Sequence, residues 1–195
     1  VDLFNYTRRA SSVAHIGAID LGGDNPIRIQ SMTTTNTNDT EACVRQAEEI
    51  IKAGGELVRF TTQGSREAEN MKNINAGIRA DGYQTPLVAD VHFNPNVADV
   101  AALYCEKVRV NPGNYVDPAR KFIKQEYTDE EYAHELQKIE DRFVPFLNIC
   151  KEHHTAIRIG VNHGSLSDRI RNRYGDTPEG IVESCLEFLR ICKKE

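Results

Sequence analysis

Five short apolar segments, separated by stretches with helical periodicity, constrain the fold of this chain more than any other feature of its sequence. In the intervening stretches, apolar residues recur every three or four positions, as on the buried face of a helix. Strands that alternate with helices in this way predict a parallel sheet covered by helices, and so an α/β fold. The expected strands span residues 27–32, 56–61, 86–92, 107–110 and 156–161.

The order of these elements leaves two architectures open, a doubly wound sheet and a (β/α)8 barrel. The first three strands begin roughly 30 residues apart, as consecutive βα units do. A complete barrel needs eight strands and typically about 250 residues, so 195 residues with five strands would form only part of one. A short hairpin, residues 13–15 with 18–21, is expected before the first strand, and such a hairpin can plug the bottom of a barrel.

Capping residues mark the expected helix starts. Asn, Asp and Thr side chains accept hydrogen bonds from the free N–H groups of a first turn, and Pro is favoured directly after them. At two of the starts, a Glu three residues later can complete a capping box. Helices are therefore expected to begin at Asn38, Asn94, Asp117, Thr128 and Thr177.

Composition excludes several classes of protein. The chain has 39% apolar and 27% charged residues and a formal net charge of −5, which is unlike a general nucleic-acid-binding protein. No apolar run approaches the roughly 20 residues that span a membrane. The five cysteines are widely spaced, so we expect neither a disulfide framework nor a metal site made by this chain. Free thiols are typical of the reducing cytoplasm, where we expect the protein to act.

Arginines stand in the middle of the predicted strands, where an unpaired charge is costly. Arg59, Arg109 and Arg158 occur in the strings VRF, VRV and IRI, and Arg28 occupies a similar but weaker position. Side chains alternate between the two faces of a strand. Each of the three arginines therefore shares a face with polar residues near the carboxyl end of its strand, while the apolar residues share the helix-covered face.

These polar side chains are expected to meet at the carboxyl ends of the strands, where α/β barrels and open α/β sheets bind ligands. Asp90 can balance one arginine. The remaining positive charge predicts a phosphate or diphosphate site, because guanidinium binds phosphate oxygens bidentately. The alternative is an internal network of Arg, Asp and His ion pairs. No clear nucleophile–base pair is present, so no catalytic residue is assigned. The candidate substrate-binding residues are Arg59, Asp90, His92, Arg109, Asn111, Arg158, Asn162, His163 and Ser165.

Five ordered motifs carry a family resemblance. IRIQSMTTTNTNDT, ELVRFT, PLVADVHF, KVRVNPGN and IRIGVNHGSL closely resemble those of the 4-hydroxy-3-methylbut-2-enyl diphosphate synthase family. The resemblance spans roughly residues 11–189. It implies that residues 1–195 are the N-terminal portion of a TIM-barrel substrate-binding domain, with about five of eight strands and an N-terminal hairpin. It also implies that a C-terminal iron–sulfur domain is absent from this chain.

The resemblance further implies a reaction. Members of the family are oxidoreductases of the methylerythritol phosphate pathway of isoprenoid biosynthesis. They convert 2-C-methyl-D-erythritol 2,4-cyclodiphosphate to (E)-4-hydroxy-3-methylbut-2-enyl diphosphate and hold the diphosphate with barrel arginines. The full-length enzyme uses a [4Fe-4S] cluster, with flavodoxin or ferredoxin as electron donor, and a homo-oligomer is implied. None of the five cysteines lies in a matching cluster motif, so this chain alone is expected to be inactive.

Two other functions stay open. A pterin-binding barrel similar to dihydropteroate synthase also has Asp and Asn at strand ends and binds a diphosphate, but it lacks support from the repeated arginines. A non-catalytic fragment that only binds substrate would also fit a chain with no electron carrier.

Overall fold

A five-stranded parallel sheet forms the centre of the fold, in the order β3-β4-β5-β6-β7. The computed structural model describes residues 4–5, 7, 9–118, 121 and 126–195. Neighbouring strands in the sheet are also consecutive along the chain, as in a series of βα units, and the predicted α/β fold is confirmed. The strands are β3 (Gln30–Met32), β4 (Leu57–Thr62), β5 (Leu87–Val91), β6 (Lys107–Val110) and β7 (Ala156–Ile159).

The sequence pattern locates the five strands but not all of their ends. β3 begins at Gln30 and not at residue 27, because Ile27 and Ile29 are exposed and the Ile29 N–H donates to the side chain of Glu56. β7 ends at Ile159, two residues earlier than predicted, and a short 3-10 turn follows three residues later. Apolar residues near a strand end therefore do not always join the hydrogen-bonded ladder.

The predicted N-caps at Asn94, Thr128 and Thr177 are confirmed. Each side chain accepts a hydrogen bond from a backbone N–H of the first helical turn. Among the described residues, no helix is long and apolar enough to cross a membrane. The helices are α1 (Thr40–Lys52), α2 (Ser65–Ala80), α3 (Pro95–Ala102), α4 (Asp129–His153), α5 (Asp168–Tyr174) and α6 (Pro178–Lys194), and the 3-10 turns are η1 (Pro112–Asn114) and η2 (His163–Ser165).

Two other predicted helix starts have different outcomes. The cap of α1 is Asp39 and not Asn38, because the Asp39 carboxylate accepts from the Ala42 N–H at 3.0 Å while the Asn38 side chain donates to Asn36. The helix expected to begin at Asp117 runs into residues 119–120 and 122–125, which lie outside the described residues.

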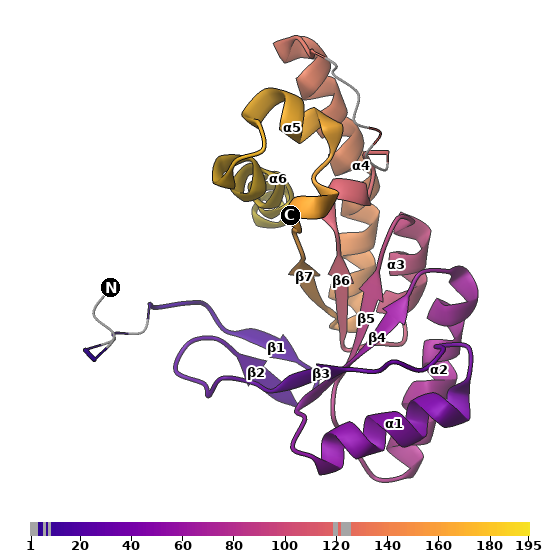
Figure 1. Cartoon of the computed structure of the whole chain (residues 1–195). Helices are drawn as coiled ribbons and strands as arrows, with labels where there is room; N and C mark the ends of the chain where they lie inside the picture. Colours follow the sequence, from indigo (N-terminus) through magenta and orange to yellow (C-terminus); the bar gives the residue numbers. More distant parts are fainter. Residues whose placement is uncertain (1–3, 6, 8, 119–120, 122–125) are drawn as a thin grey trace.

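The two faces of the sheet have different neighbours. In Figure 1, α1, α2, α3 and α4 lie along one side of the sheet, and the hairpin of β1 (Ala14–Ile16) and β2 (Ile19–Leu21) lies on the other side. The hairpin strands fall within one residue of their predicted bounds. We call the face that the hairpin approaches the inner face.

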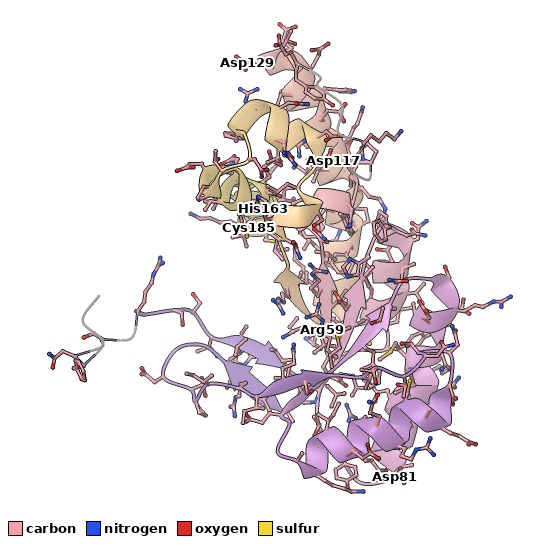
Figure 2. The ribbon with its side chains drawn as sticks, viewed as in Figure 1. Arg59, Asp81, Asp117, Asp129, His163 and Cys185 are labelled. Carbon is pink, nitrogen blue, oxygen red and sulfur yellow. The ribbon has the colours of Figure 1, made fainter. Side chains whose placement is uncertain are left out.

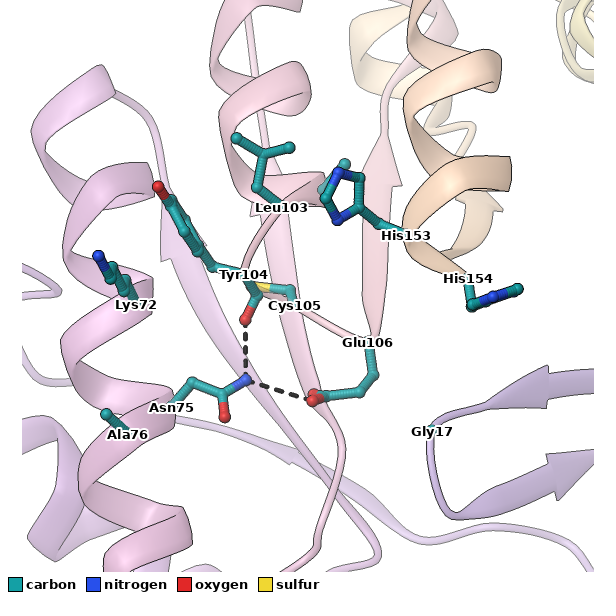
Figure 3. A pocket seen from close by; sticks show the side chains of 11 residues that line it. Gly17, Lys72, Asn75, Ala76, Leu103, Tyr104, Cys105, Glu106, His153 and His154 are labelled. Carbon is teal, nitrogen blue, oxygen red and sulfur yellow. Dashed lines mark hydrogen bonds between the residues drawn. The ribbon is translucent and has the colours of Figure 1, made fainter.

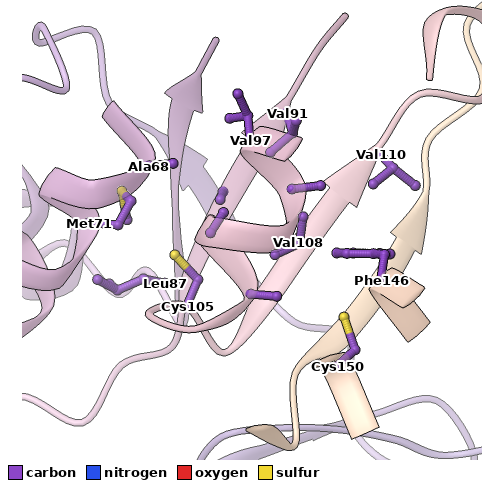
Figure 4. Packing of buried hydrophobic residues seen from close by; sticks show 14 of the residues in the cluster. Ala68, Met71, Leu87, Val91, Val97, Cys105, Val108, Val110, Phe146 and Cys150 are labelled. Atoms are coloured by element: carbon purple, nitrogen blue, oxygen red, sulfur yellow. The ribbon is translucent and has the colours of Figure 1, made fainter. Parts of the chain in front are cut away.

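Each face has its own apolar cluster. The larger one packs the outward side chains of the strands, such as Phe60 and Val108, against the helices, and Figure 4 shows part of it. Burying one such side chain stabilises a fold by roughly 1.5–3 kcal/mol. The smaller cluster joins Ile16 of the hairpin to Leu57 and Val88 near the amino ends of β4 and β5. The hairpin therefore covers the amino end of the inner face and leaves the carboxyl end to polar side chains.

Candidate functional site

The register of the parallel strands brings charged side chains together on the inner face. Asp90 of β5 stands opposite Arg109 of β6, which stands opposite Arg158 of β7. Arg59 of β4 and Lys107 of β6 lie one inward-facing position closer to the amino ends of their strands. Neighbouring strands are about 4.8 Å apart, so these five side chains form one surface, which we call the cationic surface.

Asp90 is the centre of the hydrogen bonding on this surface. Arg59 Nη2 donates to Asp90 Oδ2 at 2.5 Å, and Arg109 Nη1 donates to Oδ1 at 3.0 Å. His92 Nε2 lies 3.3 Å from the same Oδ1 atom. Burial alone would raise the pKa of Asp90, but the hydrogen bonds of His92 and Arg59 and the charge of Arg109 together lower it to about 2. Asp90 is therefore a carboxylate at any physiological pH.

Arg109 is held by three further features. Its Nη2 atom donates to the backbone oxygen of Gly160 at 2.6 Å, and its Nη1 atom lies 3.0 Å from His92 Nε2. A Cβ atom on Gly160 would lie only 2.0 Å from Arg109 Nε and 2.9 Å from its Cγ and Cδ atoms. The Arg109 side chain can therefore lie against the backbone just after β7 only because residue 160 has no side chain.

Replacing Gly160 by alanine is expected to displace Arg109 and to lower the free energy of unfolding by about 1–3 kcal/mol, the usual cost of overpacking. Chemical denaturation measures this loss. Gly164→Ala is the matched control, because the added methyl group would meet its nearest neighbour at 3.5 Å, an ordinary contact. Equal losses in the two variants would contradict the steric role of Gly160.

Positive charge exceeds negative charge on the cationic surface. Four of its side chains are basic. Among the described residues, Asp90 is the one carboxylate that pairs with any of them, and it pairs with Arg59 and Arg109. The Nε atom of Arg59 is buried and has no hydrogen-bond partner within the described part of the chain. Arg59 and Arg109 therefore share an ion-pair network with Asp90, as the alternative interpretation expected, while the phosphate site stays a prediction that the surplus positive charge favours.

Arg158 differs from its sequence-based description. It was expected to be buried in a core strand, but its side chain is exposed. β7 is the last strand in the order of the described sheet, so no neighbouring strand covers Arg158 on that side. Its charge nevertheless acts on Lys107 and Arg109, which places it beside them.

A cavity of about 390 Å³ lies at the carboxyl ends of β5, β6 and β7, next to the cationic surface. Four of the predicted site residues line it. Phe93, Gly113, Asn114 and Gly164 also line it; none of these four is a predicted site residue, although the last three lie in the NPGN and NHGSL motifs. The predicted residues that line it are His92, Asn111, Asn162 and Ser165.

The cavity wall is built by two loops that contact each other. Asn111 Nδ2 donates to Ser165 Oγ at 2.8 Å, and Asn162 Oδ1 accepts from the Gly164 N–H at 2.9 Å. A Cβ atom on Gly113 would lie 1.7 Å from the backbone oxygen of Ser165, so the strings NPGN and NHGS pack backbone against backbone. Both loops present small polar groups to the cavity, as anion sites in loops do.

Two residues lie elsewhere than the sequence suggested. His163 does not line the cavity, because its Nε2 atom is 2.5 Å from the carboxylate of Asp176 and its ring is largely exposed. Figure 2 shows Arg59 among the strands and His163 near α5 and α6. Arg28 pairs with Glu56 at 2.7 Å and donates to the Asp20 backbone oxygen, so it anchors the hairpin instead of joining the cationic surface.

A second cavity, of about 450 Å³, lies at the opposite end of the strands (Figure 3). Its polar groups are engaged with one another: Asn75 Nδ2 donates to the Tyr104 oxygen at 2.8 Å, and Glu106 accepts from Asn75 and Arg79. The amino ends of barrel strands serve stability more than catalysis. We therefore do not regard this cavity as the functional site.

The cysteines do not suit an iron–sulfur cluster. Cys43 is buried in α1, Cys105 follows α3, and Cys150 lies in α4, while α6 carries the remaining two. All five are free thiols, and burial raises the pKa of each one. Among the described residues, no group of three His, Cys, Asp or Glu side chains is placed to hold a metal ion.

The family comparison identifies the type of domain. Residues 11–195 match the family described as the GcpE TIM-barrel domain. The chain belongs to this family. The parallel sheet with its N-terminal hairpin is accordingly part of a TIM barrel and not a doubly wound sheet, and the predicted partial barrel is confirmed.

Curated relatives agree with this family. The chain is 76% identical over 195 residues to the 4-hydroxy-3-methylbut-2-en-1-yl diphosphate synthase (flavodoxin) of Phocaeicola vulgatus, covering 100% of this chain and 32% of that protein. A protein of the same name from Akkermansia muciniphila is 52% identical, with 97% of this chain and 32% of that protein covered. The chain thus spans about a third of the length of the curated relatives it matches.

A solved structure shows a weaker likeness. The dihydropteroate synthase of Burkholderia cenocepacia, complexed with 7,8-dihydropteroate, aligns with a TM-score of 0.46 and 15% sequence identity. The alignment covers 80% of this chain and 65% of that one.

Proposed function

We propose that this chain is the substrate-binding barrel part of a 4-hydroxy-3-methylbut-2-en-1-yl diphosphate synthase. The observation that carries the proposal is the cationic surface, where two of four basic side chains pair with Asp90, in a chain 76% identical to a relative of that name. The ligand of this surface is the cyclic diphosphate of 2-C-methyl-D-erythritol, whose negative charge balances the surplus of positive charge. Membership of the GcpE family favours this ligand over a pterin diphosphate.

The residues have separate tasks in this proposal. Arg158, exposed at the edge of the surface, is free to turn toward a phosphate group, and Arg59 Nε offers a buried donor that has no described partner. Arg109 and Asp90 hold each other in place beneath the ligand. Asn111, Asn162, Ser165 and His92 line the cavity where the rest of the ligand would lie. The site binds and orients the diphosphate, and we assign no proton transfer to it.

We propose that the reduction step of the reaction depends on groups that the site residues described above do not supply. Because the described cysteines are spread over several helices, and three of the five are buried, we infer that the ligands of a [4Fe-4S] cluster lie outside this chain. Flavodoxin, named for the relatives, is the proposed electron donor of the whole enzyme, with ferredoxin as the alternative. We also propose a homo-oligomer in the cytoplasm, the compartment that suits five free thiols.

A second candidate function is substrate binding without catalysis. It is favoured by the lack of any described side-chain group suited to carry electrons. Both functions predict no turnover of the cyclodiphosphate by the purified chain with dithionite as reductant. Turnover after the iron–sulfur part of a relative is added in trans distinguishes them, since a protein that only binds the substrate would still give none.

Replacing Arg158 by methionine is expected to weaken binding of the cyclodiphosphate roughly tenfold or more, because one charge-assisted hydrogen bond contributes about 1.5–3 kcal/mol. The melting temperature of the ligand-free variant should stay the same or rise, because repulsion within the cationic surface is relieved. Calorimetric titration and a thermal melt measure the two effects.

Arg66→Met is the matched control, because Arg66 is exposed on α2, away from the inner face. It should leave the affinity unchanged. Normal binding by Arg158→Met would contradict the proposal, and so would tighter binding of a pterin diphosphate than of the cyclodiphosphate by the unmodified protein.

A further inference from the structure

Lys107 is a buried lysine that the sequence analysis left out of the site. It is the first residue of β6, and only 7% of its surface is exposed. Two positions before Arg109, it points to the same inner face. Among the described residues, no hydrogen-bond acceptor or carboxylate contacts its ammonium group. A buried lysine without a counter-charge is unusual, because desolvation of an ammonium ion is costly.

Lys107 has apolar neighbours directly opposite it on the adjacent strands, and most of the charged side chains near it are basic. Val88 of β5 and Ala156 of β7 stand opposite it in the sheet, and both belong to the small apolar cluster that the hairpin covers. The hairpin itself contributes Ile16 and Ile19 to this cluster, and its titratable residues His15 and Asp20 pair with each other.

The charged groups near Lys107 come from four strands of the sheet. Arg59 is on β4, Asp90 on β5, and Arg158 on β7, while Arg109 lies on β6 itself. Asp90 is already engaged by two arginines, so it does not neutralise the lysine. Lys107 therefore forms the floor of the cationic surface, without an anion of its own.

We propose that Lys107 is a further anion-binding residue of this site, and that it takes up a proton when a diphosphate binds. This inference rests on the proposed function, because it needs the cationic surface to bind a diphosphate. In the free protein the amine is neutral part of the time. The bound anion supplies the missing counter-charge, and the amine lone pair then takes a proton from the solvent to become an ammonium ion.

The electrostatics give the pH range. Burial, and then the charges of Arg158 and Arg59, lower the pKa of Lys107 to about 8. At pH 8 about half of the free protein therefore carries a neutral Lys107. A diphosphate on the surface raises this pKa again, so saturating the site at pH 8 should consume about half a proton at this residue.

The test is calorimetric titration with inorganic diphosphate at pH 8, in two buffers of different ionisation enthalpy. The difference in apparent binding enthalpy between the buffers gives the number of protons taken up. Three proteins are compared: the unmodified protein, Lys107→Met and Lys107→Arg. Any change in the protonation of the diphosphate itself is matched best by Lys107→Arg, which keeps a positive charge at this position, so this variant is the main reference for the proton count.

We expect the unmodified protein to take up about half a proton more than either variant. Lys107→Arg keeps a permanent charge and should bind within about threefold of the unmodified protein, whereas Lys107→Met should bind roughly tenfold more weakly or worse. If the larger arginine side chain prevents folding, as circular dichroism would show, the comparison with Lys107→Met still measures the proton.

Equal proton uptake by the unmodified protein and Lys107→Met would overturn the role of Lys107 and leave the anion site intact. Absence of any diphosphate binding by the unmodified protein would overturn the anion site itself, and this inference with it.

Discussion

Replacing Asp90 by asparagine should lower the free energy of unfolding of the ligand-free protein by about 3–5 kcal/mol at pH 7, the usual cost of removing one partner from a buried ion pair. Asp90 is 4% exposed and accepts from Arg59 and Arg109, so the variant leaves both guanidinium groups among like charges. Urea denaturation measures the loss. Asp99→Asn is the matched control, because the half-exposed pair of Asp99 and Arg142 should contribute less than about 1 kcal/mol.

The Asp90 carboxylate also makes the free energy of unfolding depend on pH. The pKa of Asp90 is lowered from 3.8 to about 2 in the folded protein. Its contribution of about 2 kcal/mol is therefore complete above pH 4 and is lost as the pH falls from about 4 to about 2. Asp90→Asn should lack this component of acid denaturation.

Added diphosphate should also change the stability of Asp90→Asn and of the unmodified protein by different amounts. Inorganic diphosphate is expected to raise the stability of Asp90→Asn by a larger amount than that of the unmodified protein, because it replaces the missing negative charge. A variant as stable as the control, with no response to diphosphate, would contradict the charge balance described for the cationic surface.

Replacing Arg169 by methionine should cost a similar amount, about 3–5 kcal/mol at pH 7. Arg169 is 3% exposed and donates to both oxygens of Asp117 and of Glu187, and its guanidinium lies 4.8 Å from the ring centre of Tyr132. Without it, two buried carboxylates face each other. Chemical denaturation is again the measurement.

The pH dependence of this variant has the opposite sign. Once Arg169 is gone, burial and mutual repulsion favour the protonated form of this carboxylate pair in the folded variant but not in the unfolded chain. The folded variant then binds more protons than the unfolded one, so its stability deficit should shrink as the pH falls from 7 toward 5. Arg173→Met is the control, since Arg173 pairs with the exposed Asp129 and should contribute little. A deficit that is the same at both pH values would argue against buried, charged partners.

The Arg169 network also supports the functional site. Arg169 lies at the start of α5, directly after the NHGSL loop that lines the cavity, and Glu187 lies in α6. The network therefore fixes the loop between β7 and α5. No local pattern pointed to it, because Asp117 and Glu187 are far from Arg169 along the chain and become its neighbours only after folding.

The arginines of the strands show where local patterns stop being informative. The prediction that removal leaves stability unchanged is made for Arg158, which is exposed and has no described partner. It does not apply to Arg109, which is buried and bonded to Asp90 and Gly160. Three arginines in equivalent strand patterns thus have different energetics, because the neighbouring strand decides what each one contacts.

Periodicity, caps and side-chain alternation are local properties. The order of strands and helices, the caps at Asn94, Thr128 and Thr177, and the polar face shared by Arg59, Arg109 and Arg158 could therefore be predicted from the sequence. The five motifs also predicted the family. Strand register, burial and loop direction depend on packing between distant segments. The folded structure was therefore needed to show that Lys107 belongs to the cationic surface, that Arg158 is exposed at an uncovered strand, and that His163 turns away toward Asp176.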